Sequence, residues 1–136
     1  MPETPLPDRR KVIRYSVKIE GQRFYLDCGE YDGGTLGEIF LTCAKGGSFV
    51  RGMLDTAARL VSKMLQRGVP IAEVVEILRC HDFPPNGQVT GSKNVQEAKS
   101  VPDWVAQELY HAYCSGISLP QEKSFGYVAE SWRTEI

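Results

Sequence analysis

The sequence contains no long apolar run. No stretch approaches the roughly 18 consecutive apolar residues that a membrane-spanning helix needs. The amino terminus, MPETPLPDRRK, also lacks the apolar centre of a signal peptide. These absences predict a cytoplasmic protein that makes no contact with a membrane.

The sequence has no excess of either charge. Its 16 Lys and Arg residues stand against 17 Asp and Glu residues, which gives a net charge of -1. Proteins that bind the phosphate backbone of nucleic acid normally have a strong positive field. The balance argues against nucleic acid as the main partner, although it leaves a local basic patch open. A length of 136 residues, 42% of them hydrophobic, suits one domain with a single core.

The cysteines are not spaced for metal binding. The sequence has no C-x-x-C pair of the kind that structural zinc sites favour. Cys80, His81 and Asp82 are adjacent, but neighbouring residues rarely point at one ion. We expect reduced, mostly buried thiols, no disulfide framework and no metal site. The four cysteines are Cys28, Cys43, Cys80 and Cys114.

Residues suited to catalysis are equally few. His81 and His111 are the only histidines, and no serine or cysteine motif marks either as the base of a nucleophile pair. We therefore expect structural histidines, no catalytic residue, no cofactor and a protein that is not an enzyme. Some aromatic residues offer rings that could stack on a base, although core packing is their commoner use. They are Phe24, Tyr25, Trp104 and Tyr110.

The first half of the sequence has the alternation of β-strands. Residues 11–20 alternate imperfectly between apolar and charged, and Gly21 and Gln22 separate them from the run Arg23–Leu26. This pattern predicts a β-hairpin. The β-rich run Glu38–Cys43 predicts a third strand in the same antiparallel sheet.

Helical spacing follows the strands. Apolar residues from Phe49 to Leu65 recur every three or four positions, which predicts a helix of about five turns with one broad apolar stripe. Pro70 is suited to the first turn of a second helix, and we expect the two helices to pack as a tight pair. The rigid segment Phe83–Gly87 and a polar loop to Lys99 come next.

A third helix is predicted over residues 102–114. Ser100 is a suitable cap, Pro102 suits the first turn, and Asp103 complements the positive end of the helix. We expect Val105, Leu109, Ala112 and Tyr113 to point inward. The fold class is thus α+β: a small antiparallel sheet followed by a helical pair and a third helix.

The ends of the chain differ in composition from its centre. Residues 1–10 contain three prolines and predict an extended arm. Residues 11–116 form the predicted domain, and residues 117–136 form a C-terminal extension without clean periodicity. That extension either docks on a partner or folds back over its own core. Its aromatic residues are Phe125, Tyr127 and Trp132.

Several motifs occur together in one order: YDGGTLGEIF at 31–40, AKGGS at 44–48, QRGVP at 66–70 and FPPNG at 83–87. Together they resemble the TSCPD domain, which is found near the carboxy terminus of adenosylcobalamin-dependent (class II) ribonucleotide reductases. The resemblance extends over roughly residues 5–114. It implies a free-standing copy of an appended module, and it implies a fold more firmly than an activity.

The sequence also departs from that family. KSVPD at 99–103 keeps the Ser, Pro and Asp of the name-giving pattern but has Lys99 and Val101 where the pattern has Thr and Cys. The catalytic barrel of a reductase does not fit in 136 residues, and the cysteine-rich tail common in the full-length enzymes is missing. A complete reductase is excluded.

The junction between the third strand and the first helix is the candidate ligand site. Ser48 is a natural cap for a helix that begins at Phe49. Arg51 falls in the first turn, where a positive charge opposes the helix dipole, and a bound phosphate or carboxylate would reverse that sign. The expected ligand-binding residues are Lys45, Gly46, Gly47, Ser48, Arg51 and Arg59.

Other interpretations of this segment stay open. G-G-S by itself is more often a simple strand-to-helix turn, and Asp55 is placed to pair with Arg51 on a solvated face. Arg59 and Lys63 are either surface charge or the wall of a pocket shared between subunits. Gly52 costs a helix up to ~1 kcal/mol relative to alanine, which indicates close approach of a ligand or of another subunit.

The function that we expect is a non-catalytic binding module for a nucleotide or another phosphorylated small molecule, which it senses or sequesters. We expect a homo-oligomer. The alternative is a protein-interaction or regulatory module that acts on a separate ribonucleotide reductase subunit. A small hydrolase or transferase ranks third.

Overall fold

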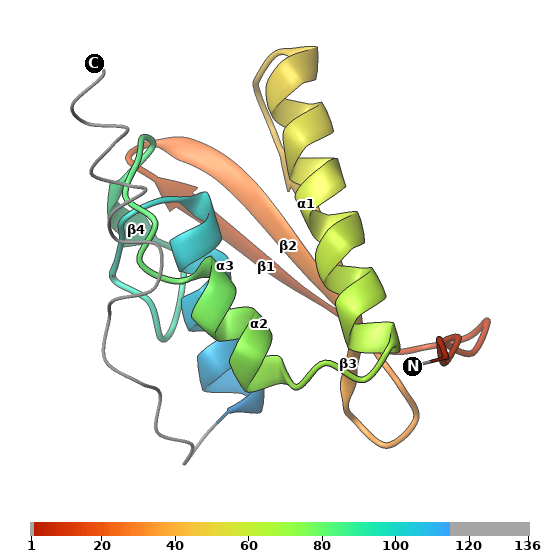
Figure 1. Ribbon diagram of the computed structural model, residues 1–136. Coiled ribbons are helices and arrows are strands. Elements are labelled where there is room, and N and C mark those ends of the chain that lie inside the picture. The colour runs from red at the N-terminus through yellow and green to blue at the C-terminus, as the bar shows by residue number, and fades with distance from the viewer. Residues whose placement is uncertain (1, 115–136) are drawn as a thin grey trace.

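The computed structural model describes residues 2–114 and contains one antiparallel sheet with the strand order β3-β2-β1-β4-β5. Three helices lie on one face of that sheet (Figure 1). The predicted α+β class is confirmed. The elements are, in order, β1 (Val12–Ile19), β2 (Gln22–Glu30), β3 (Leu36–Cys43), α1 (Ser48–Gln66), α2 (Ile71–Leu78), β4 (Gly87–Thr90), β5 (Glu97–Ala98) and α3 (Val101–Tyr113).

A tight turn joins β1 to β2. Glu20 and Gly21 occupy it with φ angles of +46° and +82°, the left-handed geometry that two-residue hairpin turns need. Ile19 pairs with Gln22, and the ladder continues to Val12 opposite Gly29. The hairpin is therefore confirmed, and β2 is longer than the run Arg23–Leu26 suggested.

The core lies between the sheet and the helices. Inward strand residues such as Ile19 and Leu26 are fully buried, as are Trp104 and Leu109 of α3. Burying one large apolar side chain stabilises a fold by about 1.5–3 kcal/mol, so these contacts fix α3 on the sheet. Ala112 of α3 is exposed, which corrects the expectation that it points inward.

Helix α1 packs along the edge strand β3. The Ser62 hydroxyl contacts both backbone groups of Ile39, since it accepts from the amide at 2.9 Å and donates to the carbonyl at 3.2 Å. Gln66 Nε2 donates to the Gly37 carbonyl at 3.1 Å. These bonds occupy backbone groups that an edge strand otherwise leaves unpaired.

The predicted tight pairing of the first two helices is wrong. Helix α2 packs mainly on α3, and the two helices lie side by side in Figure 1. Gly68 has a φ of +89° and Pro70 is extended, so the chain turns away after α1. The buried Val74 and Val75 of α2 therefore join the core beside α3 rather than beside α1.

Two short strands occupy the segment predicted as a polar loop. Strand β4 pairs with β1 through Ile19 opposite Val89, and β5 pairs with β4 through Gly87 opposite Ala98. Val89 and Ala98 are buried. Strands of four and two residues are too short for an alternating pattern to mark them.

Residues 2–10 form no helix or strand. The Thr4 amide donates to the Gln66 carbonyl at 2.8 Å, and Lys63 pairs with Glu3 at 2.7 Å. The predicted C-terminal extension at 117–136 lies outside the described residues. Among residues 2–114, no helix has the length and apolar character needed to cross a membrane.

Candidate functional site

The loop before α1 is built around glycine. Gly46 has a φ of +152°, and a Cβ at this position would lie 3.2 Å from Cys43 Sγ. Gly47 is the N-cap with φ -74° and ψ 173°, and no side chain caps the helix. Ser48 is the first helical residue, so its predicted role as N-cap is wrong. The extended conformation that a cap adopts falls on Gly47 instead.

The positively charged residues at the start of α1 are exposed to solvent. Lys45, Ser48 and Arg51 are all exposed, and Arg51 Nη2 donates to the Ala44 carbonyl at 3.3 Å. No acidic residue lies in the first turn of α1. The structure thus brings Lys45, Gly46, Gly47, Ser48 and Arg51 together at an exposed helix start.

Arg59 does not join this group. It lies eight residues after Arg51, which is about 12 Å along a helix axis. Its guanidinium pairs with Asp55 at 2.8 Å. The alternative in which Asp55 pairs with Arg51 is therefore wrong, because Asp55 is occupied by Arg59.

Arg59 instead lines a groove between α1 and β3 with a volume of about 440 Å³. Ala58, which is buried, and Ser62 contribute to it, together with charged side chains of both signs. Phe40 lines it as well and is 47% exposed, which is high for an aromatic residue. We call this the α1–β3 groove. Its lining residues are Glu38, Ile39, Phe40, Asp55, Ala58, Arg59, Ser62, Lys63 and Gln66.

Helix α1 also has an apolar line facing solvent. Phe49, Met53 and Leu60 are 77%, 54% and 62% exposed. Residues four and eleven positions apart lie near one line on a helix of 3.6 residues per turn. We call these three residues the outer stripe. Phe49 and Met53 were expected in the core-facing stripe, and their exposure corrects that prediction.

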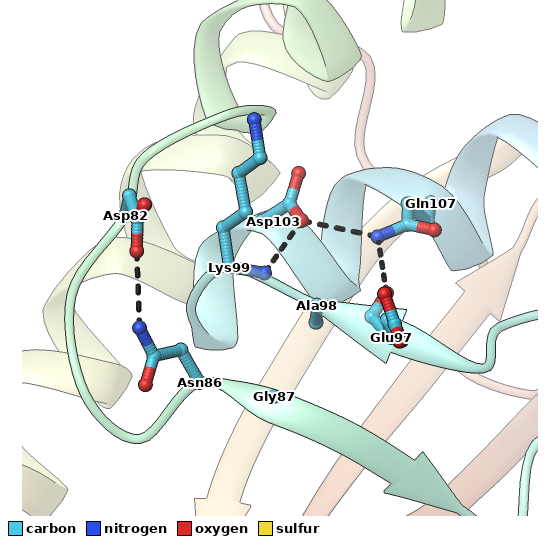
Figure 2. A pocket seen from close by; sticks show the side chains of 8 residues that line it. All are labelled: Asp82, Asn86, Gly87, Glu97, Ala98, Lys99, Asp103 and Gln107. Carbon is cyan, nitrogen blue, oxygen red and sulfur yellow. Dashed lines mark hydrogen bonds between the residues drawn. The ribbon is translucent and has the colours of Figure 1, made fainter.

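A second polar cavity, of about 470 Å³, lies where β5 passes into α3 (Figure 2). Asp103 is 6% exposed and its carboxylate accepts three hydrogen bonds. The donors are the Cys80 amide at 2.8 Å, the Lys99 amide at 2.9 Å and Gln107 Nε2 at 3.0 Å. Its lining residues are Asp82, Asn86, Gly87, Glu97, Ala98, Lys99, Asp103 and Gln107.

The segment KSVPD therefore has a structural role. Ser100 Oγ accepts from the Asp103 amide at 3.1 Å, which confirms Ser100 as the cap of α3. Pro102 lies in the first turn, where its missing N–H has no cost. Val101 is buried in the core. Asp103 ties the end of α2 to the start of α3, so the cavity wall is held by bonds already formed.

Two other carboxylates lie inside the domain. Glu108 is 2% exposed and accepts from Trp104 Nε1 and Ser92 Oγ, each at 2.9 Å. Glu30 is 8% exposed and accepts from the Tyr113 hydroxyl at 2.5 Å. Burial, followed by this hydrogen bond, raises the pKa of Tyr113. The phenol therefore stays protonated at neutral pH.

Cys28 lies near these carboxylates. Burial raises the pKa of its thiol to about 12, and the charges of Asp27, Glu30 and Glu108 add to the effect. A thiol that ionises only near that pH is a poor nucleophile, because the thiolate is the reactive form. Cys28 thus behaves as a small core residue.

The described contacts of the two histidines are local in sequence. His81 Nε2 lies 2.9 Å from the Ile77 carbonyl, and His111 makes an edge contact with Tyr110. Within residues 2–114, no group of three His, Cys, Asp or Glu side chains is arranged to hold a metal ion. The described polar groups mainly hold the fold together.

Sequence patterns missed the outer stripe and the groove. The sequence did contain a signal for the outer stripe, since Leu60 interrupts the polar face of the predicted helix at a spacing that matches Phe49 and Met53. The cavity at Asp103 was also missed as a cavity, because its lining comes from four segments that β4 and β5 bring together.

Comparison with known proteins gives one family. The TSCPD domain matches residues 2–113. The vitamin B12-dependent ribonucleotide reductase of Bradyrhizobium diazoefficiens is 39% identical over 124 residues, which cover 88% of this chain and 10% of the relative. Those of Agrobacterium fabrum and Rhodopirellula baltica are each 37% identical, covering 79% and 82% of this chain and 8% and 11% of the relatives.

The chain thus spans about a tenth of the length of these relatives. No solved structure matches. The domain match includes both the arm at residues 2–10 and the whole of α3. The resemblance found in the sequence motifs is confirmed, and this chain belongs to the TSCPD domain family.

Proposed function

We propose that this protein is a non-catalytic accessory module that binds a separate vitamin B12-dependent ribonucleotide reductase chain and influences its assembly or regulation. The observation that carries the proposal is the family relationship: the matched domain forms about a tenth of much longer reductases. We place the protein in the cytoplasm, since its four cysteines are free thiols.

The described residues fit a role in binding a partner better than a role in catalysis. Asp103, Glu108 and Glu30 are buried and hydrogen-bonded within the domain. Their arrangement satisfies the fold, because a buried carboxylate without donors would be costly. A module of this kind acts through its surface.

The α1–β3 groove is the surface that we assign to the reductase. Phe40 supplies an exposed aromatic side chain beside a groove whose buried base includes Ala58. Arg59 and Lys63 add charge along α1. An apolar anchor with a polar rim is the usual anatomy of a protein interface.

Sedimentation of the protein with the reductase of the same organism tests this assignment. We expect a complex, and Phe40→Asp should weaken it at least 30-fold or so, as loss of an interface anchor does. Val12→Asp is the matched control, because Val12 is 51% exposed on β1 and lies outside the groove. Absence of a complex with the wild-type protein, with and without nucleotides, would end the proposal.

A second function rests on the start of α1. We propose that a nucleotide or another phosphorylated small molecule binds there and is sensed or sequestered. Support comes from the missing side-chain cap, the absence of an acid in the first turn, and the neighbouring cations Lys45 and Arg51. The relatives, by name, are ribonucleotide reductases.

Thermal unfolding with nucleotides and inorganic pyrophosphate tests the second function. A ligand at 100 times its Kd adds about 2.7 kcal/mol of stability, which raises Tm by several degrees. Arg51→Ala should remove most of that rise, whereas Lys18→Ala, on β1, should keep it. Unchanged melting with every compound would count against the anion site and leave the reductase proposal standing.

A further inference from the structure

The three helices lie on one face of the sheet (Figure 1), and the other face, which we call the outer face, has two cations side by side. Val17 and Ile19 are buried, so Lys18 between them points to the outer face. Arg23 points the same way, because Phe24 next to it is buried. Lys18 and Arg23 are direct partners across β1 and β2. Like charges at directly opposite positions destabilise a sheet, so the stability of the fold does not account for this pair.

The acids of the described residues do not neutralise the two cations. Within residues 2–114, neither Lys18 nor Arg23 forms an ion pair, and the Arg23 guanidinium donates instead to Ser16 Oγ at 2.9 Å. Glu20 lies in the turn between the two strands, but its carboxylate accepts from the Gln88 amide at 3.2 Å. The pair is therefore available to an anionic ligand.

Positive charge continues from this pair to the start of α1. The Ala44 amide donates to the Arg23 carbonyl at 3.1 Å, so the chain just after β3 lies beside Arg23. Arg51 Nη2 donates to the Ala44 carbonyl at 3.3 Å, and Lys45 is the next residue in the sequence. We call Lys18, Arg23, Lys45 and Arg51 the basic strip. The chain has a net charge of -1, and the strip is a local concentration of positive charge within it.

A planar group lies on the same face as the first two residues of the strip. The Arg14 guanidinium lies over the Tyr25 ring, 4.9 Å from its centroid, and Asp27 holds it through two hydrogen bonds of 2.7 and 2.9 Å. The Arg14 side chain is 58% exposed, which leaves it accessible to a ligand. Guanidinium planes of this kind stack on the bases of single strands. Arg14 precedes Lys18 by four strand residues, about 13 Å, so a ligand that contacts both is extended.

We propose that single-stranded nucleic acid binds across the outer face, with its phosphates on the basic strip and a base on Arg14. Cations that follow the backbone next to a stacking group are the usual combination in proteins that bind single strands. The proposal extends the anion site proposed at the start of α1 and rests on it in part, because Lys45 and Arg51 belong to both. The pair formed by Lys18 and Arg23 lies outside that site.

Fluorescence anisotropy of labelled oligo-dT and oligo-U strands of about 12 nucleotides tests the proposal with the full chain. We expect a strand to bind, with an affinity that falls as salt is raised. Lys18→Ala should weaken binding and reduce the salt slope of log Kd by about 0.7, which corresponds to one lost phosphate contact. It also removes a like-charge contact, so the fold should be kept.

Lys11→Ala is the matched control. It removes the same charge from an exposed residue just before β1, about 23 Å along the strand from Lys18. This variant should bind like the wild type. Arg14→Ala should weaken binding at least about fivefold, as loss of a stacking contact does.

Two results would overturn the proposal: no binding of either strand to the wild type at low salt, or equal affinities of the Lys18→Ala and Lys11→Ala variants. Tighter binding of an acidic peptide with the same charge would overturn nucleic acid as the ligand. Either failure is distinguishable from failure of the anion site, because melting with pyrophosphate depends on Arg51 and not on Lys18.

Discussion

The starts of α3 and α1 face the same physical problem, because the first amides of any helix lack partners within it. At α3, Ser100 accepts the Asp103 amide, and the Asp103 carboxylate binds three further donors. At α1, Gly47 is the cap and no side chain contributes. One helix start is closed by the domain itself, and the other is left open to solvent.

The contrast separates the residues that build the domain from those available to partners. The closed start is buried and includes the retained Ser, Pro and Asp of the family pattern. The open start is exposed and leads into the outer stripe. Substitutions at the start of α3 should therefore mainly lower stability, whereas substitutions at the start of α1 should have small effects on stability and mainly change binding.

The largest effect on this contrast is expected from Asp103→Ala. It leaves the partly buried Cys80 and Lys99 amides without their acceptor, and each such loss costs about 1 kcal/mol, the lower end of the range for an unpaired buried group. We expect a loss of about 3 kcal/mol in the free energy of unfolding, measured with urea. Asp55→Ala, which removes an exposed ion pair of α1, should cost no more than about 0.5 kcal/mol.

Alkaline pH should weaken the buried region beneath α3. Burial raises the pKa of the Cys28 thiol to about 12 in the fold from its ordinary value of 9.0, so the unfolded chain loses this proton first. The stabilisation is complete below about pH 9 and falls as the pH rises toward 12.

At pH 10.5 the loss is about 2 kcal/mol. Urea unfolding at pH 8 and pH 10.5 measures it. A Cys28→Ala variant should lose about 2 kcal/mol less between these two pH values than the wild type does, and equal losses in both proteins would show that Cys28 is not responsible.

Removing each serine compares the two helix starts directly. Ser100→Ala should destabilise the domain by about 1 kcal/mol, since the hydroxyl caps α3. Ser48→Ala should change stability by less than about 0.3 kcal/mol, because it loses no cap bond. Similar losses in chemical denaturation would mean that α1 is capped after all.

The smallest effect is expected from Arg51→Glu. A negative charge in the first turn interacts favourably with the helix dipole, so this variant should be more stable by about 0.5 kcal/mol. Loss of the weak hydrogen bond from Arg51 to the Ala44 carbonyl reduces that gain. The gain should shrink when a phosphate compound that stabilises the wild type is added. A loss of stability without any ligand would instead show that the Arg51 hydrogen bond dominates.

Local patterns predicted much of this fold. The hairpin, the third strand and the Ser100 cap depend on neighbouring residues, and all three are confirmed. Strand β4 depends on pairing with β1 over a long separation in sequence, and β5 pairs in turn with β4, with Val89 and Ala98 as buried residues. Alternation cannot mark such short elements.

The candidate site was predictable only in part. Glycines next to a helical pattern located the exposed loop, and five of its six residues lie together. Arg59 was placed with them because the helix pattern gives the face of a residue but not its neighbours. That the loop before α1 binds a ligand stays a prediction. The outer stripe was missed because α1 has apolar residues on more than one side, and periodicity alone does not show which side meets the sheet.

The Ser62 contact with Ile39 also limits what the sheet can become. An uncovered edge strand offers a template to which strands of other chains can add. Here Ser62 and Gln66 occupy backbone groups of β3, and the opposite edge is the two-residue strand β5. The β3 edge is thus a poor template for β-sheet aggregation, because α1 already occupies these backbone groups.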